Sequence, residues 1–195
     1  MKNRATAVID IDNVLADFES AFCDAFGYEN RHLYKLEDRY PHLDENLIGE
    51  WVNSEGNYIN LSPIFGGLLL IQQLKQRGFD VVLLTSRGKH LEAVTKAWLT
   101  LYHIEPTKLI FETDKAGRIN SFNQQMKTNQ VTLFVDDSVS QLEQVKKLNP
   151  SVTCLAYDQL WNQGYYPRIR YNDKDQVYRI EASIKKGEWR SLWES

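Results

Sequence analysis

The stretch that decides the fold is AVIDIDNVLAD, residues 7–17. It begins as a short apolar run rich in β-branched residues, which is typical of a buried strand and too short to span a membrane. Asp10 and Asp12 follow at its end. Because strand side chains alternate between faces, the two carboxylates lie either on one face of a continuing strand or together in the loop that ends it. Such a cluster is either a solvated acidic turn or a site for a hard divalent cation such as Mg²⁺.

Further along the chain, short apolar runs alternate with helical periodicity. Apolar residues spaced by three and four predict a helix from Val14 to Phe26, which Gly27 ends. A looser region follows, with a short helix over 44–52 and a turn at 54–57. Strands are then predicted at 81–84, 109–111, 131–135 and 152–155, with helices at 68–77, 91–102, 116–127 and 138–148.

This alternation predicts an α/β fold with a Rossmann-like, mostly parallel sheet of about five strands and flanking helices. Residues 18–64 interrupt the alternation after the first strand, and we interpret them as a small helical cap. The α/β core then consists of residues 1–17 and 65–195. The pattern assigns no role to the tail, residues 157–195.

The composition favours a small substrate. The 195 residues include 23 Lys and Arg against 26 Asp and Glu, for a net charge of −3, so charge indicates neither a nucleic-acid partner nor a membrane surface. Cys23 and Cys154 lie far apart, which argues against a disulfide framework or a zinc site. We expect a cytoplasmic protein, and the sequence leaves its oligomeric state open.

Polar residues gather where the predicted strands end. Thr85 and Ser86 follow the second strand, Lys115 lies just past the third, and Asp136 and Asp137 follow the fourth. Each has an ordinary alternative, because a hydroxyl can cap a helix, an aspartate can form an Asx turn and a lysine is usually solvated. Ligands of open α/β sheets bind outside the carboxyl ends of the strands. The presence of all these polar residues at one edge of the sheet therefore favours a functional site.

These residue types suit phosphoryl transfer through an aspartyl-phosphate. Asp10 would be the nucleophile, close to a Mg²⁺ ion that Asp136 or Asp137 helps to bind. Asp12 would protonate the leaving oxygen and later activate water. Thr85 would donate a hydrogen bond to a phosphoryl oxygen, and Lys115 would offset the charge that builds up around it.

The segments DIDNVLAD, VVLLTS and VDDS, with a lysine before the last, resemble the motifs of the haloacid dehalogenase superfamily of Mg²⁺-dependent phosphatases. The resemblance covers residues 5 to 156. It implies the roles above for Asp10, Asp12, Thr85 and Lys115, with the backbone carbonyl of Asp12 as a further metal ligand. It leaves Lys127 open as the alternative lysine.

Two further segments, DNVLADFES and GNYINLSPIFGG, resemble the 5′(3′)-deoxyribonucleotidase branch of that superfamily. This resemblance implies a cap at 18–64 and dephosphorylation of nucleoside monophosphates. The residues that it suggests for substrate binding are Phe18, Trp51, Tyr58, Ser86 and Arg87. Two other functions stay open: a phosphatase for sugar phosphates or nucleic-acid 3′-phosphates, and a non-catalytic protein that binds phosphate or metal.

Overall fold

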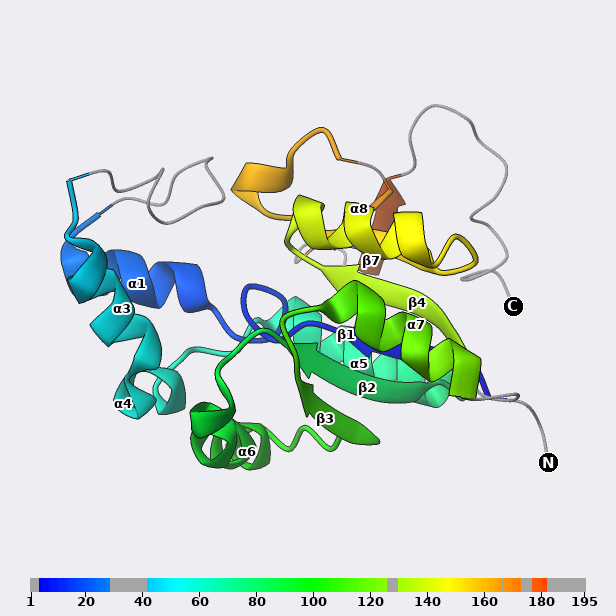
Figure 1. Ribbon diagram of the computed structural model, residues 1–195, viewed down its shortest axis with the longest axis horizontal. Helices are drawn as coiled ribbons and strands as arrows, with labels where there is room; N and C mark the ends of the chain where they lie inside the picture. Colours follow the sequence, from blue (N-terminus) through cyan, green and yellow to red (C-terminus); the bar gives the residue numbers. More distant parts are fainter. Residues whose placement is uncertain (1–3, 29–41, 126–129, 166, 173–176, 182–195) are drawn as a thin grey trace.

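A seven-stranded sheet with the strand order β3-β2-β1-β4-β5-β6-β7 forms the centre of the protein (Figure 1). The computed structural model describes residues 4–28, 42–125, 130–165, 167–172 and 177–181. Strands β1 to β6 run parallel, and β7 pairs antiparallel with β6. The strands are β1 (Thr6–Ile9), β2 (Asp80–Thr85), β3 (Lys108–Phe111), β4 (Val131–Asp136), β5 (Thr153–Tyr157), β6 (Arg168–Asn172) and β7 (Val177–Glu181).

Helices cover both faces of the sheet, which explains why the central strands are apolar throughout. Ala7 and Ile9 of β1 pack in one hydrophobic cluster with α5 (Phe65–Gln76) and α6 (Glu92–Leu101). Val8 points to the opposite face, into a second cluster with α7 (Lys115–Gln125) and α8 (Val139–Leu148). A parallel strand that is buried on both faces shows no polar alternation. The predicted Rossmann-like α/β fold is confirmed.

The strand order reverses between β1 and β4. Strands β2 and β3 lie on one side of β1, whereas β4, β5 and β6 continue on the other. In open α/β sheets such a switch point opens a crevice outside the carboxyl ends of the two strands. Asp10 directly follows β1, and Asp136 is the last residue of β4, so both lie at this switch point.

Between β1 and α5, the described residues form three helices: α1 (Phe18–Phe26), α3 (Glu45–Asn53) and α4 (Glu55–Ile59). They extend to one side of the sheet, at the left of Figure 1. The predicted helix start at Val14 is wrong, because the backbone N–H groups of residues 14–16 all donate to the Ile11 carbonyl and Asp17 caps the helix instead. The predicted turn at 54–57 is also wrong, since α4 begins there.

The sheet has more strands than the sequence indicated. Strands β6 and β7 come from the tail, where Tyr and Arg residues hid a strand period. In β6 the Ile169 side chain is buried, whereas Arg170 next to it pairs with Asp158 at 2.6 Å. Within the described residues, no helix is long and apolar enough to cross a membrane.

Gly67 brings α5 against the loop that follows β1. A Cβ atom at this position would lie 1.9 Å from the carbonyl oxygen of Val14. Only glycine permits this approach of two backbone segments. The contact ties the first turn of α5 to the loop that carries Asp12 and Asn13.

Candidate active site

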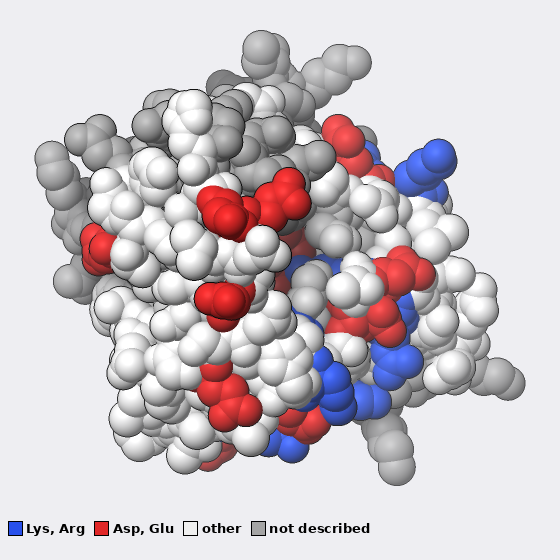
Figure 2. All heavy atoms as spheres, turned by 60° about the vertical axis from the view of Figure 1, so that its left-hand side comes forward, with Lys and Arg blue, Asp and Glu red and all other residues white. Residues whose placement is uncertain are grey.

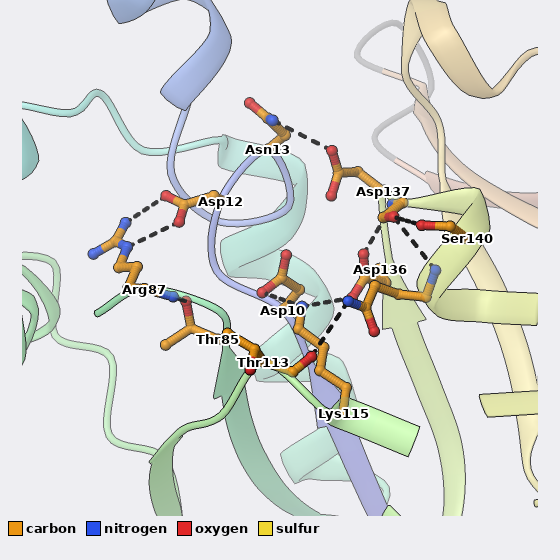
Figure 3. Close-up of polar contacts among 12 residues, drawn as sticks. Asp10, Asp12, Asn13, Thr85, Arg87, Thr113, Lys115, Asp136, Asp137 and Ser140 are labelled. Atoms are coloured by element: carbon orange, nitrogen blue, oxygen red, sulfur yellow. Dashed lines mark hydrogen bonds and ion pairs between the residues drawn. The ribbon is translucent and has the colours of Figure 1, made fainter. Parts of the chain in front are cut away.

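Three buried carboxylates meet at the switch point of the sheet. Asp10, Asp136 and Asp137 each place a carboxylate oxygen within 4.8 Å of the other two (Figure 3). The backbone of Asp10 is fixed to the neighbouring strand, because its N–H donates to the Val135 carbonyl at 2.9 Å. The parallel pairing of β1 with β4 therefore sets the distance between these acids.

Lys115 is the cation of this cluster. It is the first residue of α7, and its Nζ lies 2.8 Å from Asp10 Oδ1 and 2.7 Å from Asp136 Oδ2. Its side chain is only 2% exposed. Burial lowers the pKa of Lys115, but the charges of Asp10 and Asp136 outweigh burial and raise it above its ordinary value, so the ammonium stays protonated. The alternative lysine, Lys127, lies outside the described residues.

One ammonium does not balance three buried carboxyl groups. Burial, followed by the charges of Asp136 and Asp12, raises the pKa of Asp10 to about 7 although Lys115 acts in the opposite direction. Burial and the charges of Asp136 and Asp10 also raise the pKa of Asp137 well above its ordinary value. Ionising all three carboxyl groups is therefore unfavourable unless a further cation binds. Their ligand atoms are all oxygen, which suits a hard divalent cation such as Mg²⁺.

The two aspartates after β4 have different partners. Asp136 is held at both oxygens, because Oδ1 accepts the Ser138 N–H at 2.8 Å and Oδ2 accepts Lys115. Asp137 Oδ2 accepts one long hydrogen bond of 3.3 Å from Asn13 Nδ2. Asp136 thus forms the Asx turn that the sequence offered as an alternative to a functional role. It also lies in the three-carboxylate cluster. Asp137 has more freedom to bind a metal directly.

The loop after β1 depends on Asn13. This residue has φ of 59°, a left-handed conformation that asparagine tolerates better than most residues. Its Oδ1 accepts the Glu19 N–H at 2.9 Å, which joins the loop to the start of α1. Its backbone carbonyl accepts Gln159 Nε2 at 2.6 Å.

Asp12 points away from the three-carboxylate cluster, towards Arg87 (Figure 3). Arg87 Nε donates to Asp12 Oδ2 at 2.9 Å and Nη2 donates to Oδ1 at 2.6 Å. The sequence suggested that Arg87 reaches a substrate; the structure places its guanidinium against Asp12. Burial opposes the charge of Arg87, yet the Asp12 carboxylate raises its pKa above the ordinary value.

Thr85 and Ser86 lie at the carboxyl end of β2. Neither caps a helix, because Gly88 and Leu91 occupy the N-cap positions of the next two helices, η1 (Lys89–Leu91) and α6. Thr85 is buried, and its Oγ1 accepts the Arg87 N–H at 3.2 Å. Ser86 is exposed. The ordinary alternative of a capping hydroxyl therefore does not hold.

The aromatic residues expected to bind substrate pack mainly against each other. The Phe18 ring lies 5.1 Å edge-on from Trp51 and 6.2 Å from Tyr58. Phe18 and Trp51 are half-buried, and Tyr58 is buried with its hydroxyl donating to the Val52 carbonyl at 2.8 Å. Phe22 completes this small core between α1 and α3.

The loop after β5 contributes residues that the sequence did not single out. Asn162 is buried, and its Nδ2 donates to the Asp137 carbonyl at 3.0 Å. Trp161 Nε1 donates to the same oxygen at 3.3 Å. Together with Gln159 on the Asn13 carbonyl, these side chains hold two loops of the site. Their position just after a parallel strand was the signal that could have identified them.

Comparison with solved structures identifies this fold. No protein-family model matches the sequence, and no curated protein matches it. A dehalogenase structure is 13% identical with a TM-score of 0.55, and the match covers 86% of this chain and 89% of that one. The haloacid dehalogenase-like hydrolase SP0104 from Streptococcus pneumoniae is 13% identical, with a TM-score of 0.54 and coverage of 81% and 86%. The HAD-hydrolase YfnB from Bacillus subtilis, solved with bound magnesium, is 13% identical, with a TM-score of 0.53 and coverage of 80% and 89%. The chain therefore has the fold of the haloacid dehalogenase-like hydrolases.

Proposed function

We propose that this protein is a Mg²⁺-dependent phosphomonoesterase that acts through an aspartyl-phosphate on Asp10. The observation that carries the proposal is the contact of Lys115 with Asp10 and Asp136 beside Asp137. A carboxylate attacks an anionic phosphate only where cations offset the repulsion, and this cluster provides one buried cation and the ligands for a second.

We propose one role for each residue of the cluster and for Asp12. Asp10 attacks phosphorus with one carboxylate oxygen, the bond from phosphorus to the ester oxygen breaks, and Asp12 gives that oxygen a proton. Water then attacks the phosphorus of the aspartyl-phosphate, Asp12 takes a proton from it, and inorganic phosphate leaves Asp10. Lys115 stabilises the charge throughout. Asp10 and Asp137 would hold Mg²⁺, with the Asp12 carbonyl as a further ligand, and the ion would polarise the phosphoryl oxygens.

The charge of the inserted helices favours a small phosphoester over a nucleic-acid end. Residues 18–64 contain nine Asp and Glu against three Lys and Arg, and within 17–28 and 42–64, the part that the structure describes, there is no Lys or Arg. Figure 2 shows separate acidic side chains on this side of the molecule, next to a hollow. A long polyanion would be repelled here, whereas a nucleotide carries little charge beyond the reacting phosphate. Sugar phosphates meet the same condition, so it is the resemblance of DNVLADFES and GNYINLSPIFGG to the 5′(3′)-deoxyribonucleotidase branch that leads us to propose nucleoside monophosphates, including deoxy forms, as substrates.

A phosphate-release screen tests the proposal. The panel contains nucleoside and deoxynucleoside monophosphates, sugar phosphates, a 3′-phosphorylated oligonucleotide and p-nitrophenyl phosphate, each with Mg²⁺ or with EDTA. We expect release from a nucleoside monophosphate that needs Mg²⁺ and is lost in Asp10→Asn. Full activity in EDTA or in Asp10→Asn would refute the mechanism. Halide release from a 2-haloacid without phosphate release would point to dehalogenation instead.

A further inference from the structure

The Arg87 guanidinium forms hydrogen bonds with two other residues of the protein. Nε and Nη2 bind the two oxygens of Asp12, and Nη1 donates to Thr95 Oγ1 at 3.0 Å. The side chain of Arg87 is 1% exposed, whereas that of Asp12 is 23% exposed. The arginine is therefore fixed by its surroundings, and the more accessible aspartate is fixed by the arginine.

Two helices, α6 and α4, contact the Arg87 guanidinium. Thr95 is fully buried in the middle of α6, where a hydroxyl is costly unless it has a hydrogen-bond partner. Tyr58 of α4 lies with its ring 4.5 Å from the Arg87 guanidinium carbon, within the range of a cation–π contact. The Tyr58 ring is itself fixed through its hydroxyl on Val52. The inserted helices thus contact the group that orients Asp12.

We infer that Arg87 is a positioning residue that holds the Asp12 carboxylate for proton transfer, with Tyr58 and Thr95 as its supports. This inference rests on the proposed function, because it assigns Arg87 to the acid/base residue of that reaction and not to the substrate. A bidentate pair fixes both the place and the plane of a carboxylate. Each Asp12 oxygen keeps a lone pair for a proton, because the arginine occupies only one side of it.

A double-mutant cycle separates this role from direct substrate binding. Arg87→Lys keeps a buried cation but cannot form the two-pronged contact. We expect it to lower kcat about 10-fold or more with KM changed less than about threefold, and never to cost more than Asp12→Asn, which removes the whole acid/base contribution of about 10²–10⁴-fold. In the Asp12→Asn background the same change should alter kcat less than about threefold.

Matched variants test the supports. Tyr58→Phe keeps the ring over Arg87 and should lose less kcat than Tyr58→Leu, which removes the cation–π contact. Lys89→Met is the control for charge, because Lys89 is an exposed cation close to Arg87 in the chain and pairs with Glu92. We expect Lys89→Met to keep kcat. A loss of kcat in Lys89→Met as large as that in Arg87→Met, which also removes one positive charge, would mean that general charge, not positioning, matters.

The outcomes distinguish this inference from the proposed function. If the fold losses of kcat in Arg87→Lys and Asp12→Asn multiply in the double variant, the inference is overturned. A large rise in KM for Arg87→Lys alone would also overturn it, and either result would leave the phosphatase activity in place. If the wild type releases no phosphate from any substrate, the proposed function fails. In that case the urea unfolding midpoints of the same single and double variants are compared. If the shifts for Arg87→Lys and Asp12→Asn simply add, the two residues are not coupled and the inference fails as well.

Discussion

Asp10→Asn should stabilise the metal-free protein at pH 8 although it removes the proposed nucleophile. Burial and the neighbouring carboxylates raise the pKa of Asp10 from 3.8 to about 7. Between these two values the folded state keeps a proton that the unfolded chain has released, so stability falls as the pH rises from about 4 to about 7. At about 1.4 kcal/mol per pH unit, the ionised Asp10 destabilises the folded state by about 4 kcal/mol above pH 7.

Asparagine is neutral in both states and escapes this cost. We expect Asp10→Asn to raise the free energy of unfolding by about 2–4 kcal/mol at pH 8 in EDTA, since the amide packs less well than the carboxylate against Lys115. At pH 4 the two proteins should be about equally stable. Urea unfolding at pH 4, 6 and 8 measures the difference, and the wild type is repeated with excess Mg²⁺, which should stabilise it more than Asp10→Asn. A variant that is no more stable than the wild type at pH 8 would refute the reasoning that burial and repulsion within the cluster create the need for a cation.

Three other substitutions probe single features of the site and the fold. Lys115→Met removes the buried cation and should lower kcat by about 10²–10³-fold in steady-state assays of phosphate release; a loss below about threefold would remove Lys115 from the reaction. Gly67→Ala should lower the free energy of unfolding by about 2–3 kcal/mol, because the new Cβ meets the Val14 carbonyl, and an unchanged urea midpoint would contradict that close approach. Gly49→Ala is its matched control: a Cβ there meets nothing within 4 Å. It should raise the free energy of unfolding by about 0.5–1 kcal/mol, and a loss of stability would contradict the open space around this position in α3.

Much of the fold followed from local patterns in the sequence. The apolar runs that became β1, β2, β3, β4 and β5 were recognisable because buried parallel strands carry few polar residues. Parallel strands also bring their carboxyl ends to one edge. The covalent order alone therefore predicted that Asp10, Lys115 and Asp136 would lie near one another, and the structure places them in contact. The division into a core and a cap at 18–64 stays a prediction.

Other features depended on contacts that no local pattern contains. The Phe18 and Trp51 rings were candidates for substrate binding, and their packing against each other emerged only when α1 and α3 were placed together. The left-handed backbone of Asn13 likewise reflects the closed loop between β1 and α1, whose ends are tied by Asn13 Oδ1 and the Glu19 N–H. Strands β6 and β7 were hidden because arginine and tyrosine residues interrupt the apolar residues in their sequences, RIRYN and VYRIE.

The opening stretch AVIDIDNVLAD shows the division most clearly. The sequence by itself determined that a buried strand ends in two carboxylates, because the apolar run and the two aspartates are adjacent in the chain. Only the tertiary structure decided that their side chains part. Asp10 turns to Lys115, whereas Asp12 turns to Arg87, which lies 75 residues further along the chain. Hydrophobic periodicity fixes which face of an element is buried, but the partner of a charged side chain depends on which elements the folded chain brings together.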